Sequence, residues 1–162
     1  MGETTDVSVD PDVPDRPTVV IAEDEPDLRR LIRLRLNRSE HFQIVSEAEN
    51  GVQAIDLATE HQPDVMLLDI RMPEMDGRTA LPRIVREAPR TMVVILSVLP
   101  ASVEEQPALA LGAFAYLEKH ILDGQELPEH LIALLAEFRR ALDGEDLVAP
   151  ILRHPPGPAT RP

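Results

Sequence analysis

Short apolar runs alternate with amphipathic segments along the chain, and this pattern predicts five strands, each followed by a helix. The runs cover residues 18–22, 42–46, 65–68, 91–97 and 113–117. Apolar, β-branched runs of this length, bounded by turn residues, are typical of strands buried on both faces of a parallel sheet. Strand–helix alternation builds such a sheet with helices on both faces and right-handed crossovers. We therefore predict an α/β fold.

The segments between the runs carry apolar residues at helical spacing, as in Leu28, Leu31 and Ile32. The predicted helices run from Pro26 to about residue 36, from residue 52 to about His61, through residues 81–85, over residues 101–111 and over residues 127–142. Proline removes a helical hydrogen bond, so Pro82 fits the third helix only within its first turn. For the same reason Pro107 predicts that the fourth helix is short or kinked.

Both ends of the chain differ in composition from the centre. Residues 1–17 contain five acidic residues and three prolines, and residues 143–162 contain five prolines without apolar periodicity. Such segments bury too little apolar surface to order themselves. We predict two disordered tails around a single domain of residues 18–142.

Composition excludes several function classes. The net charge of −13 and the four aromatic residues disfavour direct binding of nucleic acid. The chain lacks cysteine, and it has neither a recognisable signal peptide nor an apolar run of the roughly 20 residues that span a bilayer. We expect a cytoplasmic protein that contacts neither DNA nor membrane.

Four of the five predicted strands end in chemically reactive residues: Glu23 and Asp24, Asp69, Ser97, and Lys119. The carboxyl ends of parallel strands share one edge, where ligands bind in open α/β sheets. Asp69 alone could simply terminate its strand, but the convergence argues against that interpretation. Lys119 is the single lysine among 16 basic residues. Chance could explain it, but so could a requirement for a compact ammonium group.

This set of residues suits phosphoryl transfer to a carboxylate. Asp69 can act as the nucleophile and form an acyl phosphate. The clustered carboxylates need a cation, and a few hard oxygen ligands favour Mg²⁺. Ser97 can hydrogen-bond a phosphate oxygen, and Lys119 can neutralise charge on the transferring group.

Four pieces of the sequence together resemble the receiver domain of bacterial two-component response regulators. They are residues 19–26, residues 67–77, the strand that ends at Ser97, and residues 112–119. The resemblance covers about residues 18–142. It implies a flavodoxin-like (βα)5 fold with a doubly wound parallel sheet in the strand order 2-1-3-4-5.

The resemblance also implies roles for individual residues. Asp69 would accept phosphate from a histidine kinase or phosphotransfer protein. Mg²⁺ would be bound directly by Asp24, Asp69 and the main-chain carbonyl of Arg71, and through water by Glu23. Ser97 and Lys119 would contact the phosphoryl group. Tyr116 matches the family's switch aromatic; the alternative is an ordinary half-buried strand residue.

The chain departs from the family pattern at several positions. Glu23 replaces the commoner Asp, and His120 stands where many receivers have Pro. Val98 follows Ser97 where a smaller residue is usual, which predicts slower access of the phosphoryl donor. Pro107 lies in a helix that many receivers use for partner binding, so that face is predicted to be non-standard.

The sequence fits other functions less well. A phosphatase with an aspartyl nucleophile would need a second Asp where the chain has Arg71. A non-phosphorylated interaction module, or the receiver part of a regulator whose output domain is missing, remain alternatives. If the chain is complete, its output is expected to be contact with an unidentified downstream protein or phosphorelay, since the last twenty residues are too few for a helix-turn-helix.

Overall fold

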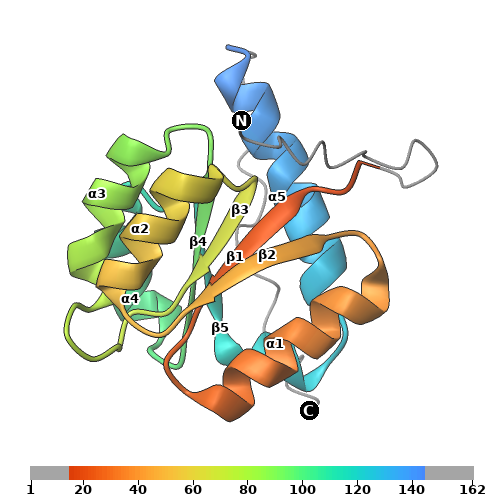
Figure 1. The fold of residues 1–162 in the computed structure, drawn as a ribbon, viewed down its shortest axis with the longest axis horizontal. Coiled ribbons are helices and arrows are strands. Elements are labelled where there is room, and N and C mark those ends of the chain that lie inside the picture. Colours follow the sequence, from red (N-terminus) through yellow and green to blue (C-terminus); the bar gives the residue numbers. More distant parts are fainter. Residues whose placement is uncertain (1–14, 145–162) are drawn as a thin grey trace, which may run out of the picture.

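The structure, a computed structural model, describes residues 15–144; the two predicted tails lie mostly outside this range, and their predicted disorder stays a prediction. Five strands form one parallel sheet in the order β2-β1-β3-β4-β5 (Figure 1). They are β1 (Thr18–Ala22), β2 (Gln43–Ala48), β3 (Val65–Leu68), β4 (Met92–Ser97) and β5 (Ala115–Glu118). The predicted flavodoxin-like strand order is therefore confirmed.

Helices cover both faces of the sheet (Figure 1). They are α1 (Pro26–Ser39), α2 (Gly51–His61), α3 (Gly77–Glu87), α4 (Ala101–Ala110) and α5 (Leu127–Leu142), with a 3₁₀ turn, η1 (Lys119–Asp123), before α5. In Figure 1, α2 and α3 lie on one side of the sheet, and α1 and α5 lie on the other. This is the doubly wound arrangement that strand–helix alternation predicts.

Neighbouring residues of each strand point into two separate cores. On one face, Val20 of β1 and Met66 of β3 pack with residues of α2, α3 and α4. On the other face, Ile21 of β1 packs with Ile32 of α1 and Leu131 of α5. Because the central strands are buried on both faces, they read as continuous apolar runs in the sequence.

The parallel register aligns the carboxyl ends of the strands. Ala22, the last residue of β1, pairs with Ala48 of β2 and with Leu68 of β3. Leu68 pairs in turn with Ile95 of β4, two residues before Ser97, which pairs with Glu118 of β5. The residues that follow these ends therefore gather on one edge.

Two prolines show where the sequence prediction was wrong and where it was right. Helix α3 begins at Gly77, so Pro82 lies beyond its first turn, contrary to prediction. Pro82 and Arg78, four residues earlier, are both exposed, so water can satisfy the Arg78 carbonyl that lacks a helical donor. Helix α4 contains Pro107 and is short, as predicted, with 10 residues.

Strand boundaries differ slightly from the predicted ones. β2 starts one residue later and ends two residues later than expected, and β5 starts at Ala115 rather than residue 113. Phe42 lies outside β2 but is almost fully buried against the α1–α5 face. Its apolar character reflects core packing rather than strand pairing, which sequence periodicity cannot distinguish.

Candidate functional site

The carboxyl edge of the sheet carries a compact acidic cluster. One carboxylate oxygen each from Glu23, Asp24 and Asp69 lies within 4.8 Å of the other two. The backbone N–H of Asp69 donates to the Ala22 carbonyl, which continues the β1–β3 pairing to the site. Glu23 and Asp69 are buried, whereas Asp24 is exposed. The cluster therefore has two inner carboxylates and one at the surface.

Lys119, directly after β5, contacts both inner carboxylates. Its Nζ lies 2.8 Å from Glu23 Oε2 and 3.1 Å from Asp69 Oδ2. The predicted gathering of Glu23, Asp24, Asp69 and Lys119 from three strand ends is thus present in the structure. A single ammonium faces two buried acids, so the cluster has a deficit of positive charge.

Burial and this charge imbalance shift the protonation of the inner groups. Burial, with a further contribution from the charge of Asp69, raises the pKa of Glu23 to about 7. Burial also raises the pKa of Asp69, although the ammonium of Lys119 opposes the rise. Burial lowers the pKa of Lys119, but its hydrogen bond to Glu23 and the charge of Asp69 outweigh this and keep the pKa above its usual value.

The donor set fits a small hard cation. All three members offer carboxylate oxygen, the ligand type that Mg²⁺ prefers, and the exposed side of Asp24 leaves room for water or phosphate oxygens. A divalent cation would supply the positive charge that Lys119 alone does not. Arg71 lies two residues after Asp69 in the following loop and is exposed; its carbonyl remains a predicted ligand.

Gly77 holds the loop after Asp69 close to the site. Its N–H donates to the Ile70 carbonyl at 2.7 Å. A Cβ at this position would collide with the Asp69 carbonyl oxygen, so only glycine permits the approach. The sequence did not predict this role for Gly77; the available signal of a tight contact is a glycine that opens a helix directly after an Asp.

A second contact ties the same loop to α2. The N–H of Gly51 donates to the Met75 carbonyl at 2.8 Å. The side chain of Asn50 caps α2 by accepting from Gln53 N, and its amide lies 3.3 Å from Glu74 Oε2. Asn50-Gly51 is a dipeptide typical of turns, but nothing in the sequence predicts its contact with the loop after Asp69.

Ser97 and Tyr116 meet at the β4–α4 loop. Ser97 is fully buried, and its Oγ accepts from the N–H of Leu99 at 3.2 Å. Tyr116 is also fully buried, so it is not the half-buried strand residue considered as an alternative. Its hydroxyl donates to the Leu99 carbonyl at 2.7 Å, and burial raises its pKa. Both side chains therefore bind the backbone of Leu99: Ser97 binds its N–H and Tyr116 binds its carbonyl.

Glu118 provides a further link between β5 and α4. Its Oε1 accepts from the N–H of Ala101, the first residue of α4, at 2.7 Å. Pro100, the residue before the helix, makes no side-chain cap. Glu118, at the end of β5, therefore caps the N-terminus of α4 instead. Its Oε2 lies 3.1 Å from Nδ1 of His120. These contacts flank Lys119 on both sides and were not predicted.

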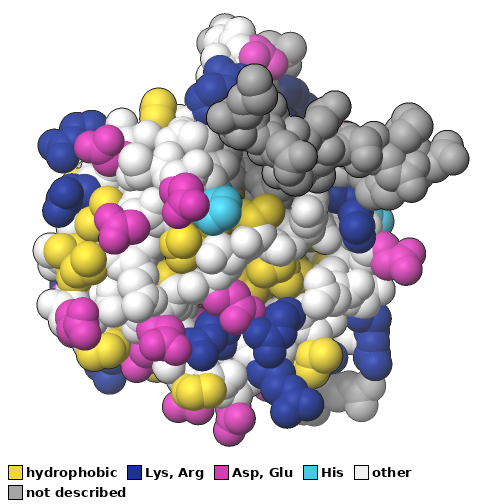
Figure 2. Space-filling view, viewed as in Figure 1, with side chains coloured by type: hydrophobic (Ala, Val, Ile, Leu, Met, Phe, Trp, Pro, Cys, Tyr) yellow, Lys and Arg dark blue, Asp and Glu magenta, His cyan; other side chains and the backbone are white. Residues whose placement is uncertain are grey.

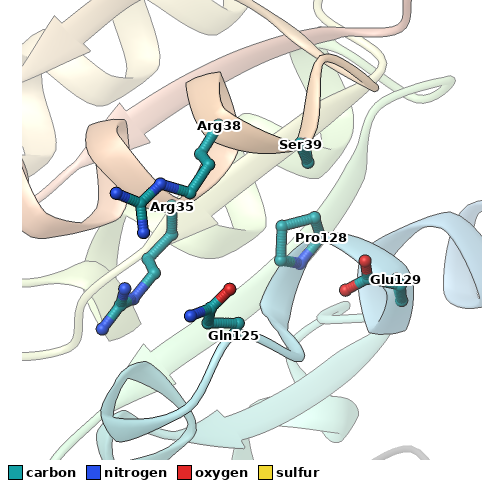
Figure 3. A pocket seen from close by; sticks show the side chains of 6 residues that line it. All are labelled: Arg35, Arg38, Ser39, Gln125, Pro128 and Glu129. Atoms are coloured by element: carbon teal, nitrogen blue, oxygen red, sulfur yellow. The ribbon is translucent and has the colours of Figure 1, made fainter.

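The structure also has surface hollows that share no residue with the acidic cluster. One lies between the second half of α1 and the start of α5 (Figure 3), and its lining is Arg35, Arg38, Ser39, Gln125, Pro128 and Glu129. Another is lined by residues that include Pro63, Leu135 and Phe138. These two hollows are therefore separate from the candidate chemistry at the sheet edge. Among helices within residues 15–144, none has the length and apolar character needed to cross a membrane.

Comparison with known families gives a match over most of the chain. Residues 19–132 match the response regulator receiver domain family. The transcriptional regulatory protein PdtaR of Mycobacterium tuberculosis H37Rv is 37% identical over 146 residues, which cover 89% of this chain and 68% of PdtaR. A protein-glutamate methylesterase/protein-glutamine glutaminase of Myxococcus xanthus is 36% identical over 112 residues, covering 68% of this chain.

Solved structures support the same relationship. The receiver domain of the response regulator NarL from Mycobacterium tuberculosis is similar with a TM-score of 0.68 and 32% identity, covering 76% of this chain and 98% of that domain. The response regulator domain of Thermotoga maritima CheB gives a TM-score of 0.63 at 26% identity, covering 79% and 97%. The chain spans only 31%, 29% and 28% of the length of three curated methylesterase relatives.

Proposed function

The chain belongs to the response regulator receiver domain family, and we propose that its Asp69 accepts a phosphoryl group from a histidine kinase or phosphotransfer protein. The observation that carries this proposal is the position of Asp69 at the end of β3, 3.1 Å from Lys119 and beside two further carboxylates. A nucleophilic carboxylate next to an ammonium and a candidate cation site is the arrangement that phosphoryl transfer to Asp needs.

The transfer forms one bond and breaks one. A carboxylate oxygen of Asp69 attacks phosphorus, and the bond from phosphorus to the donor's imidazole nitrogen breaks with its electron pair going to that nitrogen. Lys119 faces the attacking carboxylate and offsets the negative charge of the incoming phosphoryl oxygens. Glu23 and Asp69 are themselves buried and the side chain of Lys119 is only 10% exposed, so the inner side of the reacting carboxylate faces protein groups.

Asp24, Asp69 and the main-chain carbonyl of Arg71 would hold Mg²⁺, and Glu23 would act through a bound water. When bound, the cation supplies positive charge to the phosphoryl oxygens. Receiver domains bind Mg²⁺ at an acidic pocket of this kind. The raised pKa of Glu23 and Asp69 supports a requirement for additional positive charge in this cluster.

Phosphorylation would be transmitted through the β4–α4 loop. Ser97 would donate its hydroxyl proton to the phosphoryl group, and because its Oγ accepts from the N–H of Leu99, a movement of Ser97 toward the phosphoryl group would also pull on that loop. Tyr116 holds the carbonyl of the same residue, so a shift of this loop changes the environment of Tyr116. A new charge at Asp69 thereby biases a surface formed by α4 and β5.

The output is proposed to be phosphorylation-dependent protein contact or phosphorelay, without direct DNA binding. The acidic balance of the chain, −13, supports this choice. The relatives' own names include transcriptional regulators and a methylesterase, but those names describe proteins longer than the matched region. A non-phosphorylated interaction module, and the receiver of a regulator with a missing output domain, are the alternatives.

Incubation with acetyl phosphate and Mg²⁺, followed by intact-mass measurement, tests the proposal. We expect a mass gain of one phosphoryl group, lost in Asp69→Asn and when EDTA replaces Mg²⁺. Asp76→Asn is a matched control, since Asp76 is an exposed carboxylate that caps α3 in the loop beyond the site. No gain in wild type with acetyl phosphate or with a panel of phosphorylated histidine kinases would favour the interaction module instead.

A further inference from the structure

Arg29, on the first turns of α1, makes a contact that the proposed phosphoryl chemistry does not itself require. Its Nη1 donates to the main-chain carbonyl of Glu23 at 2.8 Å. The side chain is only 14% exposed, whereas Arg30 and Arg38 of the same helix are exposed. A largely buried arginine that binds a backbone carbonyl is a fixed structural contact and not a solvated surface charge.

Two acids of β2 and the loop after it fix the orientation of the same guanidinium. Nη2 lies 3.3 Å from Glu49 Oε1, and Nε lies 3.6 Å from Glu47 Oε2. Figure 2 shows basic and acidic side chains side by side where Figure 1 places α1 against β2. Arg29 thus joins the carboxyl ends of β1 and β2, and its charge is balanced locally.

The contact falls at the turn that presents the acidic cluster. The N–H of Glu23 donates to Ala48 of β2, and its side chain reaches Lys119 and the N–H of Glu25. Its carbonyl is part of the peptide bond that joins Glu23 to Asp24. Arg29 is therefore the side chain that restrains the backbone just before the exposed carboxylate of Asp24.

We propose that Arg29 is a positioning residue that holds the Glu23–Asp24 turn in the geometry required to bind the divalent cation. This inference rests on the proposed function, because it concerns the cation site of the same phosphoryl-transfer centre. Without Arg29 the turn retains its contacts through Ala48 and Lys119 but loses the restraint on the Glu23 carbonyl. Asp24 then samples more orientations, and each Mg²⁺ that binds must order it.

Electrostatics alone predicts the opposite direction for the loss of Arg29. Removing the positive charge of Arg29 leaves the negative charges of Glu47 and Glu49 unbalanced. The nearby acidic cluster should then attract a cation more strongly. Arg33 separates the two effects. It lies one turn along α1 and pairs with Glu47 at 2.6 Å, but the hydrogen bonds of the structure do not join it to Glu23. Arg33→Gln therefore removes an equal positive charge from beside Glu47, but it leaves the contact between Arg29 and the Glu23 carbonyl in place.

The experiment is calorimetric titration of Mg²⁺ into unphosphorylated wild type, Arg29→Gln, Arg33→Gln and Arg29→Lys. We expect the dissociation constant of Arg29→Gln to rise about tenfold, and that of Arg33→Gln to stay at the wild-type value or fall. Arg29→Lys should lie between, because its ammonium can make a single bond to the carbonyl. Equal affinities for Arg29→Gln and Arg33→Gln would overturn the proposal.

A second readout separates positioning from general loss of structure. In metal-free protein, amide hydrogen exchange at Glu25 should be faster in Arg29→Gln than in Arg33→Gln, while exchange within β3 stays unchanged. If Arg29→Gln does not fold, the comparison of Arg29→Lys with wild type carries the same test. Wild type that binds Mg²⁺ but is never phosphorylated would defeat the proposed function and leave this inference standing.

Discussion

Lys119 Nζ lies 2.8 Å from Glu23 Oε2, closer than its 3.1 Å distance to Asp69 Oδ2. The glutamate that stands in place of the family's commoner Asp is thus long enough to reach the ammonium directly. In metal-free protein, Lys119 is shared between the two buried carboxylates. The cation would relieve this competition, because it supplies a second positive charge to the same cluster.

The raised pKa of Glu23 predicts that metal-free protein loses stability as pH rises. An unfolded glutamate releases its proton near its usual pKa of 4.5, whereas the folded one, with a pKa of about 7, keeps it to higher pH. Between these values the folded state binds the extra proton, so the stabilisation present below 4.5 is lost progressively as pH approaches 7. Asp69 shifts in the same direction. The contribution from Glu23 amounts to about 3 kcal/mol.

Glu23→Gln isolates this effect, because glutamine does not titrate. The free energy of unfolding is measured with urea in EDTA at pH 5 and at pH 8. Relative to wild type, the free energy of unfolding of the variant should rise by about 2 kcal/mol from pH 5 to pH 8. Addition of Mg²⁺ should reduce that difference. A free-energy difference between variant and wild type that is the same at both pH values would show that Glu23 stays ionised throughout.

Val98 predicts a restriction on phosphoryl access. It follows the buried Ser97 and is itself 64% exposed at the carboxyl edge of the sheet. Val98→Ala removes two methyl groups from the outer surface of the loop and should speed labelling by acetyl phosphate about 2–5-fold, or about 0.4–1 kcal/mol in the barrier. Val103→Ala, an equally exposed valine on α4, is the control. Equal rates for Val98→Ala and wild type would refute the prediction.

Glu118 should stabilise α4 from outside that helix. Glu118→Ala removes the acceptor for the Ala101 N–H and should lower the free energy of unfolding by about 1 kcal/mol. Glu118→Gln keeps an acceptor oxygen and loses only the negative charge that faces His120, so it should cost less. Amide exchange in the first turn of α4 measures the difference. If the Ala101 amide exchanges at the same rate in both variants, the cap from Glu118 does not contribute significantly to the stability of α4.

Gly77 is expected to tolerate no side chain. In Gly77→Ala the Cβ would meet the carbonyl oxygen of Asp69, a backbone atom that moves only with β3. We expect the free energy of unfolding to fall by about 2–4 kcal/mol and Mg²⁺ to bind more weakly, because the loop after Asp69 must shift. Gly144→Ala is a useful contrast, because that glycine has open space around it. Its positive φ of 77° still adds some strain, so its loss should be small but measurable.

The sequence by itself determined the α/β class, the strand order implied by its family resemblance, and the gathering of Glu23, Asp24, Asp69 and Lys119 at one edge. These follow from short-range patterns and from a general property of parallel sheets. Apolar runs identify buried strands, and parallel strands place all their carboxyl ends together. Residues directly after such strands can therefore be assigned to the site without coordinates.

The tertiary structure decided which side chains hold those residues in place. In the sequence, Arg29 lies among the polar positions of the first predicted helix, Glu118 follows the fifth predicted strand, and Gly77 lies in the segment after Asp69; none of these positions predicts a contact. Their contacts join segments that are distant in sequence or depend on fine backbone geometry: Glu118 reaches Ala101, and Arg29 reaches Glu23 and Glu49. Periodicity reports only whether a position faces the core. The partner of a polar group depends on how helices and loops pack, and that is settled only by the folded chain.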